Sequence, residues 1–393
     1  MLPNIDIELG QGGLGLVIPT DDALSGMILQ GPAPASLSLS TPKLITSLQD
    51  AEDLGITAAY DSDNSLSAHK AIKEFYTEAQ TGSKLWIIVI SQAVNMATAL
   101  DSAENYATLL LNAAGGGIRM LTMVRNPAGG YTPTVTAGLD ADVANAITKA
   151  QALAVAYTAQ YKPIRVILPA YGYTGVAGDL VDLKQRTDNR VAVLLGDTAA
   201  GVNAAVGVLL GRLASVPVQR NPGRVKNGSL PITAAYIASE TVEVAGGDVA
   251  IIHDKGFVTL RKHIGFSGYY FSDDPTATAA TDDYSSLARG RIIDKAIYLA
   301  YRTYVNELLD EIRINPDNGR LQLAQAKYLQ QTVETAINNT MTAANEIVSV
   351  AAQVDPLQNV LSTSKICIEL RIVPFGYARE IKITLGFTNP ANA

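Results

Sequence analysis

The chain has 393 residues, of which 48% are hydrophobic and 17% are charged, and its formal net charge is −7. This length suffices for two or three domains with buried cores, and the acidic balance argues against nucleic acid as a partner, because phosphate binding requires a basic face. The single Cys367 excludes an intramolecular disulfide, and we expect it to be a buried thiol on a strand. No long uninterrupted apolar run occurs, so we expect no membrane insertion.

Residues 1–20 are predicted to form an extended arm. Residues 4–9 alternate between polar and apolar side chains, which is the period of a strand, and a glycine-rich segment follows them. One short strand cannot form a sheet alone, so we predict that it pairs with the edge of a sheet in a neighbouring subunit. The residues of this predicted strand are Asn4, Ile5, Asp6, Ile7, Glu8 and Leu9.

Three glycines after this strand, Gly10, Gly12 and Gly15, also fit the dinucleotide-binding pattern G-x-G-x-x-G. That pattern binds a cofactor only where a buried strand turns into a helix. Here the strand carries two carboxylates on one face, and Pro19 stands where the helix should run. The sequence therefore predicts no cofactor.

Residues 21–225 are predicted to form an α/β domain. After a turn-rich link at 21–42, helical and apolar segments alternate. Four apolar strands separated by helices imply a mostly parallel sheet that is covered on both faces. The predicted strands are 85–90, 118–124, 164–170 and 190–196, and the predicted helices are 65–82, 95–117, 140–160, 178–186 and 198–215.

The carboxyl ends of these strands are the place where doubly wound folds bind ligands. Ser91, Arg125, Pro169 and Asp197 stand there, but the chain has neither a phosphate-binding loop nor a G-x-S-x-G elbow. Asp197 alone is more typical of a helix cap than of a catalytic acid. An α/β enzyme with a site near Asp197 is thus a minor alternative, and we predict no catalytic residue.

Residues 198–239 contain no Asp or Glu, although the chain as a whole is acidic. Their basic side chains are predicted to dock on an acidic protein or a neighbouring subunit, and a solvated loop is the alternative. Nucleic acid is a weaker third option, because no aromatic residue is interleaved with these charges. The four basic residues are Arg212, Arg220, Arg224 and Lys226.

Residues 242–283 are predicted to contain two strands, at 249–252 and 256–262, and they raise the question of a metal. His253 and His263 lack a third ligand at a suitable spacing. Four aspartates that flank a Thr/Ala loop near the end of this region lack the spacing of a calcium loop, so we predict no metal. These aspartates are Asp273, Asp274, Asp282 and Asp283.

The last quarter of the chain predicts two long helices, 283–314 and 321–345, followed by strands at 364–373 and 380–387. The first helix has an apolar stripe, and its charged face carries Arg291 among others, for which we expect partners beyond the helix. In both strands apolar residues alternate with polar ones, which predicts a sheet with one face on the helices. The alternating residues, which we also expect to exchange between subunits, are Ile366, Ile368, Leu370, Ile372, Ile381, Ile383, Leu385 and Phe387.

Four stretches resemble the contractile tail sheath family of bacteriophages and phage-like injection machines. They are TPKLITSLQDAEDLG, GRLASVPVQRNPGRVKNGSL, the segment from GFVTLRKHIGFSGYYF to AYRTYVNELLD, and KICIELRIVPFGYAREIKITLGF. The resemblance divides the chain into an amino-terminal arm (1–20), the α/β domain (21–225), a sheath core module (226–379) and a carboxy-terminal arm (380–393). A shortened amino-terminal region and the lack of a large insertion distinguish the chain from the family pattern.

What the resemblance implies is a structural protein rather than an enzyme. Sheath subunits form hexameric rings that stack helically around an inner tube, and their terminal arms add strands to the sheets of neighbours. Contraction then drives the tube through the target envelope. The implied partners are further copies of the chain, the tail tube protein, and baseplate and tail terminator proteins, with assembly in the bacterial cytoplasm into a virion tail. Another self-assembling virion or shell protein is the alternative.

Overall fold

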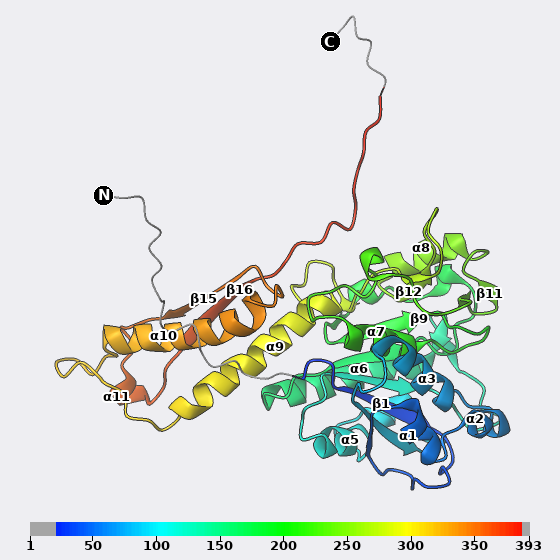
Figure 1. Cartoon of the computed structure of the whole chain (residues 1–393), viewed down its shortest axis with the longest axis horizontal. Coiled ribbons are helices and arrows are strands. Elements are labelled where there is room, and N and C mark those ends of the chain that lie inside the picture. The colour runs from blue at the N-terminus through cyan, green and yellow to red at the C-terminus, as the bar shows by residue number, and fades with distance from the viewer. Residues whose placement is uncertain (1–20, 387–393) are drawn as a thin grey trace, which may run out of the picture.

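The computed structural model describes residues 21–386. The predicted strand at residues 4–9, the glycine pattern after it and Phe387 lie outside the described residues. Figure 1 shows a rounded α/β part, which holds the first three quarters of the chain, and an elongated carboxy-terminal module beside it. The long helix α9 (Leu287–Tyr304) leaves the α/β part and enters the module, so it belongs to both.

An eight-stranded sheet forms the centre of the α/β part, in the order β13-β12-β9-β7-β4-β1-β3-β2. The strands from β12 to β3 run parallel, and β13 and β2 add antiparallel edges. The central strands are apolar runs buried on both faces, as a helix-covered parallel sheet requires, and this confirms the predicted fold class. The strands are β1 (Ser25–Gln30), β2 (Lys43–Ile45), β3 (Leu85–Ile90), β4 (Met120–Val124), β7 (Arg165–Pro169), β9 (Val191–Leu195), β12 (Val258–Arg261) and β13 (Tyr270–Phe271).

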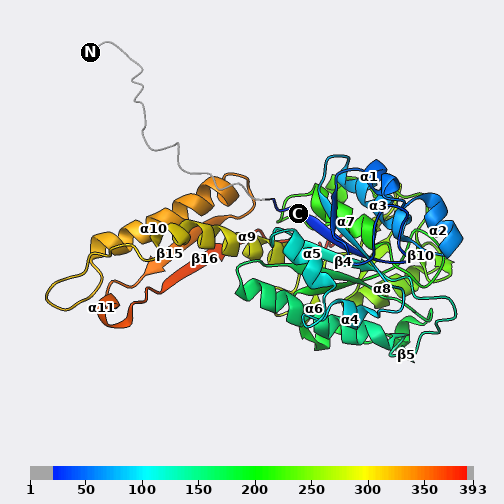
Figure 2. The ribbon, with the colours of Figure 1, turned by 90° about the horizontal axis from the view of Figure 1, so that it is seen from below.

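Helices cover both faces of this sheet, with α3 and α7 on one side and α4 and α6 on the other (Figure 2). Helices α3 and α7 approach closely because α7 presents glycine: a Cβ at Gly207 would lie 2.2 Å from the carbonyl oxygen of Ala71. The helices of this part are α1 (Leu48–Asp53), α2 (Ala58–Asn64), α3 (Ala68–Ala79), α4 (Met96–Ala99), α5 (Ala107–Ala113), α6 (Ala141–Ala159), α7 (Val206–Ser215) and α8 (Gly246–Asp254). Three further two-stranded antiparallel pairs are β5 (Val135–Thr136) with β6 (Leu139–Asp140), β8 (Thr187–Asp188) with β14 (Ala277–Thr278), and β10 (Tyr236–Ile237) with β11 (Glu240–Thr241).

The carboxy-terminal module packs a two-stranded antiparallel sheet against α9 and α10. The sheet places Leu370 and Ile372 on the helices, where they meet a core that includes Leu299, Val333 and Ile337. The alternation predicted for this strand is therefore confirmed. The elements of the module besides α9 are α10 (Leu323–Ile337), a π-helical turn (Asn338–Thr342), β15 (Ser349–Val354), α11 (Val360–Thr363) and β16 (Ile368–Val373).

Two six-residue strands, β1 and β15, and several strands of two or three residues were not predicted from the sequence. The segment 21–42, expected to be only a turn-rich link, contains β1, which lies in the middle of the large sheet between β3 and β4. The sequence analysis also missed β15, which supplies the partner of β16. Both are short segments flanked by small or polar residues, and only pairing with distant strands makes them β-structure.

Other expectations around the second half of the chain need correction. The segment 249–252, expected to be a strand, lies in α8, and 178–186 forms short 3-10 turns rather than a helix. The first long helix ends at Tyr304 instead of residue 314, because the chain turns away after one 3-10 turn. Strand β12, which was predicted at 256–262 within the sheath core module (226–379), belongs to the large sheet instead, and so does β13, which was not predicted.

The end of the chain differs from the expected strand pair. Residues 380–386 form no strand in the described structure, and their side chains are exposed, because β16 pairs with β15 instead. Strand β16 begins at Ile368, so Cys367 precedes it and is exposed rather than buried. The expectation of a buried thiol is therefore wrong.

Candidate functional site

The open edge of β16 is the main feature of the carboxy-terminal module. Each residue from Ser349 to Val354 on β15 faces a residue of β16, and the register pairs Val350 with Ile372 and Val354 with Ile368. Among residues 21–386, no strand pairs with the other edge of β16. A sheet of only two strands is marginally stable. Its unpaired edge, with free N–H and C=O groups, can pair with a further strand.

An apolar groove of about 750 Å³ adjoins this open edge. It lies between the end of α9, the loop that follows α9, and strand β16. Leu308, Leu309 and Leu361 line it with side chains that are 68%, 104% and 71% exposed. Exposed leucines gathered around a groove mark a binding surface rather than ordinary scatter. The other residues that line the groove are Ala300, Tyr304, Glu307, Asp310, Ile312, Ile314, Leu329, Val333, Val360, Ser364, Ile366, Ile368 and Leu370.

The same chain carries a segment with the matching pattern. In Figure 1 the carboxy-terminal segment leaves β16 and turns away from both parts of the molecule. Ile381, Ile383 and Leu385 lie on this segment, at the two-residue spacing of a strand, and each is at least 73% exposed. Lys382 and Thr384 alternate with them. Apolar side chains at every second residue are typical of a strand that buries one face. In this chain that face is exposed.

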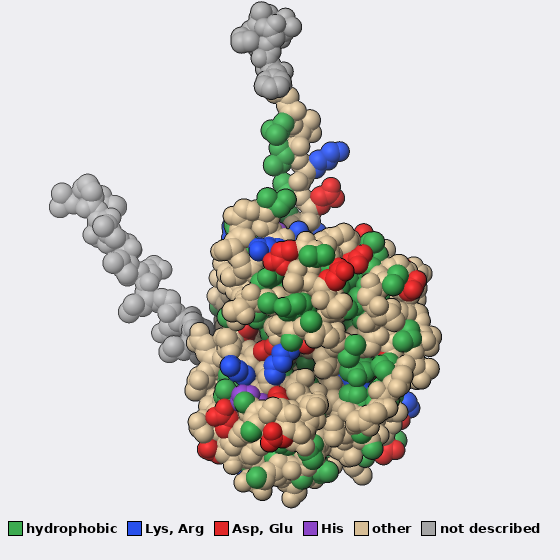
Figure 3. Space-filling model, turned by 90° about the vertical axis from the view of Figure 1, so that its right-hand side faces the viewer, with side chains coloured by type: hydrophobic (Ala, Val, Ile, Leu, Met, Phe, Trp, Pro, Cys, Tyr) green, Lys and Arg blue, Asp and Glu red, His purple; other side chains and the backbone are tan. Residues whose placement is uncertain are grey.

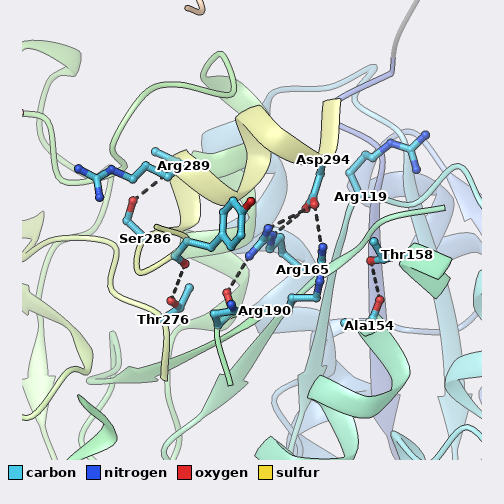
Figure 4. A network of polar contacts seen from close by, with 12 residues as sticks. Arg119, Ala154, Thr158, Arg165, Arg190, Thr276, Ser286, Arg289 and Asp294 are labelled. Carbon is cyan, nitrogen blue, oxygen red and sulfur yellow. Dashed lines mark hydrogen bonds and ion pairs between the residues drawn. The ribbon is translucent and has the colours of Figure 1, made fainter. Parts of the chain in front are cut away.

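Helix α9 is held to the α/β part by buried charges (Figure 4). The Nε and Nη2 atoms of Arg165 on β7 donate to the two carboxylate oxygens of Asp294 at 2.7 and 3.2 Å, and Arg190 donates to Asp294 at 2.9 Å. One turn away, Arg291 donates to the carbonyl oxygens of Leu213 and Val216. Burial lowers the pKa of Arg291 to about 10, with nearby carboxylates opposing the shift. Arg291 thus finds partners beyond the helix, as predicted.

The carboxyl ends of β4, β7 and β9 are filled by the protein's own side chains. Arg125 is buried, donates to Gln30 at 3.0 Å and lies over the rings of Tyr131 and Tyr171 at 4.8 and 5.7 Å. Next to it the remaining cavity measures about 10 Å³, which is room for about one water molecule. The space that a substrate would need at the strand ends is therefore taken up by protein.

Asp197 borders this small cavity but does not cap a helix, since α7 begins nine residues later. Its carboxylate contacts Lys70 Nζ at 2.5 Å, and its backbone bridges to Tyr236. Ser91, at the end of β3, is exposed and accepts a hydrogen bond from the backbone N–H of Ala93. These contacts give both residues structural roles, so the helix-cap interpretation of Asp197 is wrong.

The four basic residues of the predicted docking patch are not equivalent. Arg212 is buried and pairs with Glu78 through two hydrogen bonds of 2.7 and 2.8 Å, so it is not available to a partner. Burial raises the pKa of Glu78, although Arg212 opposes the shift. Arg220 and Arg224 are half-buried, and Lys226 is exposed. The docking prediction therefore stands on these last three residues only.

The face of the α/β part that lies opposite the carboxy-terminal module mixes its charges (Figure 3). Acidic, basic and apolar side chains are interspersed there, unlike the broad basic surface of a nucleic-acid-binding protein. His253 lies on α8, whereas His263 follows β12 and packs edge-on against Phe266 and Tyr270. Within residues 21–386, no group of three His, Cys, Asp or Glu side chains is arranged to hold a metal ion. None of the helices in this range has the length and apolar character that a bilayer crossing demands.

Comparison with protein families matches two family models that together span nearly the whole chain. The DUF2586 N-terminal domain matches residues 2–275, and the DUF2586 C-terminal domain matches residues 283–392. Comparison with curated protein sequences gave no match.

Comparison with solved structures gives full-length similarity at low sequence identity. A chain of the cryo-EM structure of the anti-feeding prophage baseplate is 14% identical, with a TM-score of 0.65 and 99% of each chain covered. The helical sheath of the anti-feeding prophage in its contracted state is 15% identical, with a TM-score of 0.63 and 99% of each chain covered. The contracted sheath complex of the extracellular contractile injection system PVC is 10% identical, with a TM-score of 0.62, covering 100% of this chain and 98% of the other. The chain belongs to the DUF2586 family, and its fold is that of tail sheath proteins.

Proposed function

We propose that the chain is the repeating subunit of a contractile sheath, which polymerises as stacked hexameric rings around an inner tube and contracts to drive that tube through a target envelope. The observation that carries this proposal is the unpaired edge of β16 beside an apolar groove, together with an exposed strand-like arm on the same chain. The similarity over the whole chain to sheath structures supports it.

The groove and the arm fit each other as acceptor and donor. An arm from a neighbouring copy would add backbone hydrogen bonds to the free edge of β16 and insert Ile381, Ile383 and Leu385 into the groove. Within its own chain, the arm leaves the module and turns away from it. The amino-terminal residues Asn4 to Leu9 would add a second donated strand to the same small sheet.

The energetic scale favours exchange of more than one strand for each subunit. Burying three aliphatic side chains contributes on the order of 5–9 kcal/mol. Ordering and immobilising a partner costs about 4–15 kcal/mol. A single donated strand therefore gives only weak association, whereas two arms from each subunit, repeated around a ring, give a stable mesh.

The buried ion pairs of α9 determine which parts of such a subunit can move relative to each other. Because Asp294 is bonded to β7 and to Arg190 while the far end of α9 lies in the module, the two parts of one subunit resist bending at their junction. Rearrangement during contraction would then occur between subunits, with whole chains moving as rigid bodies while the exchanged arms keep them linked.

The remaining partners follow from the same proposal. The tube protein would lie inside the ring, and baseplate and terminator proteins at its two ends, in a tail assembled in the bacterial cytoplasm. Arg220, Arg224 and Lys226 would contact an acidic surface of a neighbouring subunit or partner. Reversing these three charges would then weaken assembly in a salt-dependent manner.

The experiment that tests the proposal is truncation of either arm. Deletion of residues 1–15 or 380–393 should leave a folded protein that no longer forms tubes under negative stain, because each deletion removes one donor strand. Full-length protein purified in parallel should form tubes. Long tubes from either truncated chain would refute strand exchange, and folded full-length protein that forms closed shells would favour the shell alternative.

A further inference from the structure

The carboxy-terminal arm has a defined root on the α/β part. Of residues 374–379, Tyr377 and Arg379 hold the segment in place. The hydroxyl of Tyr377 donates to the carbonyl oxygen of Gln219, and Nε of Arg379 lies 2.6 Å from Oδ2 of Asp273. Beyond Arg379, residues 380–386 are exposed. The free part of the arm therefore begins at Glu380.

Arg379 binds a pair of adjacent buried carboxylates. Asp274 is fully buried, and its Oδ1 atom lies 3.5 Å from Nη2 of Arg379. The side-chain amide of Asn221 donates to both carboxylates, at 2.5 Å to Asp273 and 2.7 Å to Asp274. Burial and the charge of Asp273 raise the pKa of Asp274. Burial also acts to raise the pKa of Asp273, but Arg379, together with hydrogen bonds from Asp274 and Asn221, lowers it overall. Arg379 thus offsets a concentration of negative charge that burial would otherwise disfavour.

Asp274 also caps the first turn of α9. Oδ2 of Asp274 accepts the backbone N–H of Ala288 at 2.7 Å, and its carbonyl oxygen accepts the N–H of Leu287 at 2.8 Å. One carboxylate therefore serves both α9 and the root of the arm. A change at Arg379 is transmitted to the start of α9 through a single residue.

The root of the amino-terminal arm is tied to the same helix. Nζ of Lys295 lies 2.7 Å from the carboxylate of Asp22, two residues beyond the predicted arm at 1–20, and 2.7 Å from Glu346 of the carboxy-terminal module. Lys295 stands eight residues after Leu287, which is about 12 Å along a helix. The attachments of both arms thus lie within three turns of α9, where Asp294 also joins the helix to the large sheet.

We propose that the first half of α9 is the junction at which both arms of a subunit are fastened, and that Arg379 is the positioning residue that fixes where the donated strand begins. Tension between neighbouring copies would then pass from one arm to the other through α9. The force-carrying role rests on the proposed sheath function, whereas the attachment of the arm root is a property of the single chain.

Spin labelling tests the attachment in unassembled, full-length protein. Because Cys367 is the only cysteine, Cys367→Ser gives a background in which Ala378→Cys places one label at the arm root. A second label at Ile383→Cys reports the free arm. We expect slow motion at position 378 and nanosecond-scale motion at 383. Arg379→Gln should make the label at 378 clearly more mobile, although Tyr377 still holds the neighbouring residue.

Lys382→Gln is the matched control, since it removes one positive charge from the same arm beyond the root. It should leave the label at 378 slow. Equal mobility at 378 and 383 in the parent protein, or no change in Arg379→Gln, would overturn the attachment. Restored slow motion in a charge exchange, Arg379→Asp with Asp273→Arg, would support it.

Tubes test the force-carrying role separately. Arg379→Gln tubes should break into short pieces when contraction is triggered, whereas Lys382→Gln tubes should contract intact. Intact contraction of Arg379→Gln tubes would refute the force path even if the label at 378 becomes mobile. Failure of the proposed sheath function would appear differently, as folded full-length protein that forms no tubes or forms closed shells.

Discussion

Arg165 of β7 and Asp294 of α9 form a two-bond ion pair at 2.7 and 3.2 Å, and both side chains are almost fully buried. The pair joins the centre of the large sheet to the helix that enters the carboxy-terminal module (Figure 4). Burying a single charge is costly, so the pair is stable only because each buried charge is neutralised and hydrogen-bonded by its partner.

Asp294→Asn should destabilise the protein by about 3–5 kcal/mol, because it leaves Arg165 and Arg190 facing each other without the carboxylate that neutralises them. The free energy of unfolding in urea measures the effect. Glu369→Gln, which breaks an exposed pair with Arg371 on β16, should leave the unfolding midpoint unchanged. Equal effects of the two substitutions would contradict the claim that the buried pairs of Asp294 stabilise the protein more than the exposed pair does.

Gly290→Ala should destabilise the protein although alanine favours helices. In an open helix position this substitution stabilises by about 1 kcal/mol. In α9, however, a Cβ at Gly290 would lie 2.2 Å from Cζ of Arg165, which is fixed by Asp294. Gly247→Ala in α8 is the matched control, since nothing lies within 4 Å of its added Cβ, and it should raise the thermal midpoint. Stabilisation by both substitutions would show that Arg165 moves freely.

Leu361→Glu should prevent tube formation without changing the stability of the single chain. Leu361 lines the groove beside β16 and is 71% exposed, so a carboxylate there remains solvated until an apolar arm enters. Electron micrographs and the thermal midpoint are the two measurements. Val176→Glu, at an exposed position on the α/β part, should leave tubes intact. Normal tubes from Leu361→Glu would exclude the groove as the acceptor.

Asp274 should make stability depend on pH in a defined window. Burial, and after it the charge of Asp273, raises the pKa of Asp274 to about 7 from an ordinary 3.8. Arg379, Arg291 and Tyr377 are the other ionisable groups around it. Because the folded state binds this proton more tightly than the unfolded state, the contribution is complete below pH 3.8 and is lost as pH rises to about 7.

The slope reaches at most about 1.4 kcal/mol per pH unit for one proton. Urea titrations of the parent protein between pH 4 and pH 7 should show this loss, and Asp274→Asn, which keeps an acceptor for the N–H of Ala288, should remove it. If stability falls equally with pH in both proteins, ionisable groups other than Asp274 cause the pH dependence.

The amino-acid sequence by itself determined the elements whose pattern is local. The apolar runs of β3, β4, β7 and β9, and the alternation in β16, are periodicities that burial on one or two faces imposes on neighbouring residues, and each prediction was confirmed. The same alternation at Ile381, Ile383 and Leu385 gave a strand-like arm, and the structure leaves that arm exposed.

Tertiary structure alone decided which segments pair and which charges become buried. Strand β1 lies at the centre of the large sheet and β15 occupies the place expected for residues 380–387, because hydrogen bonding to a distant strand outweighs weak local preference. The sequence predicted partners for the charged face of α9 but not which ones: Asp294 and Lys295 are buried against charges far away in the chain. Such pairing depends on long-range geometry, which local periodicity does not encode, and that geometry places both arm roots on α9.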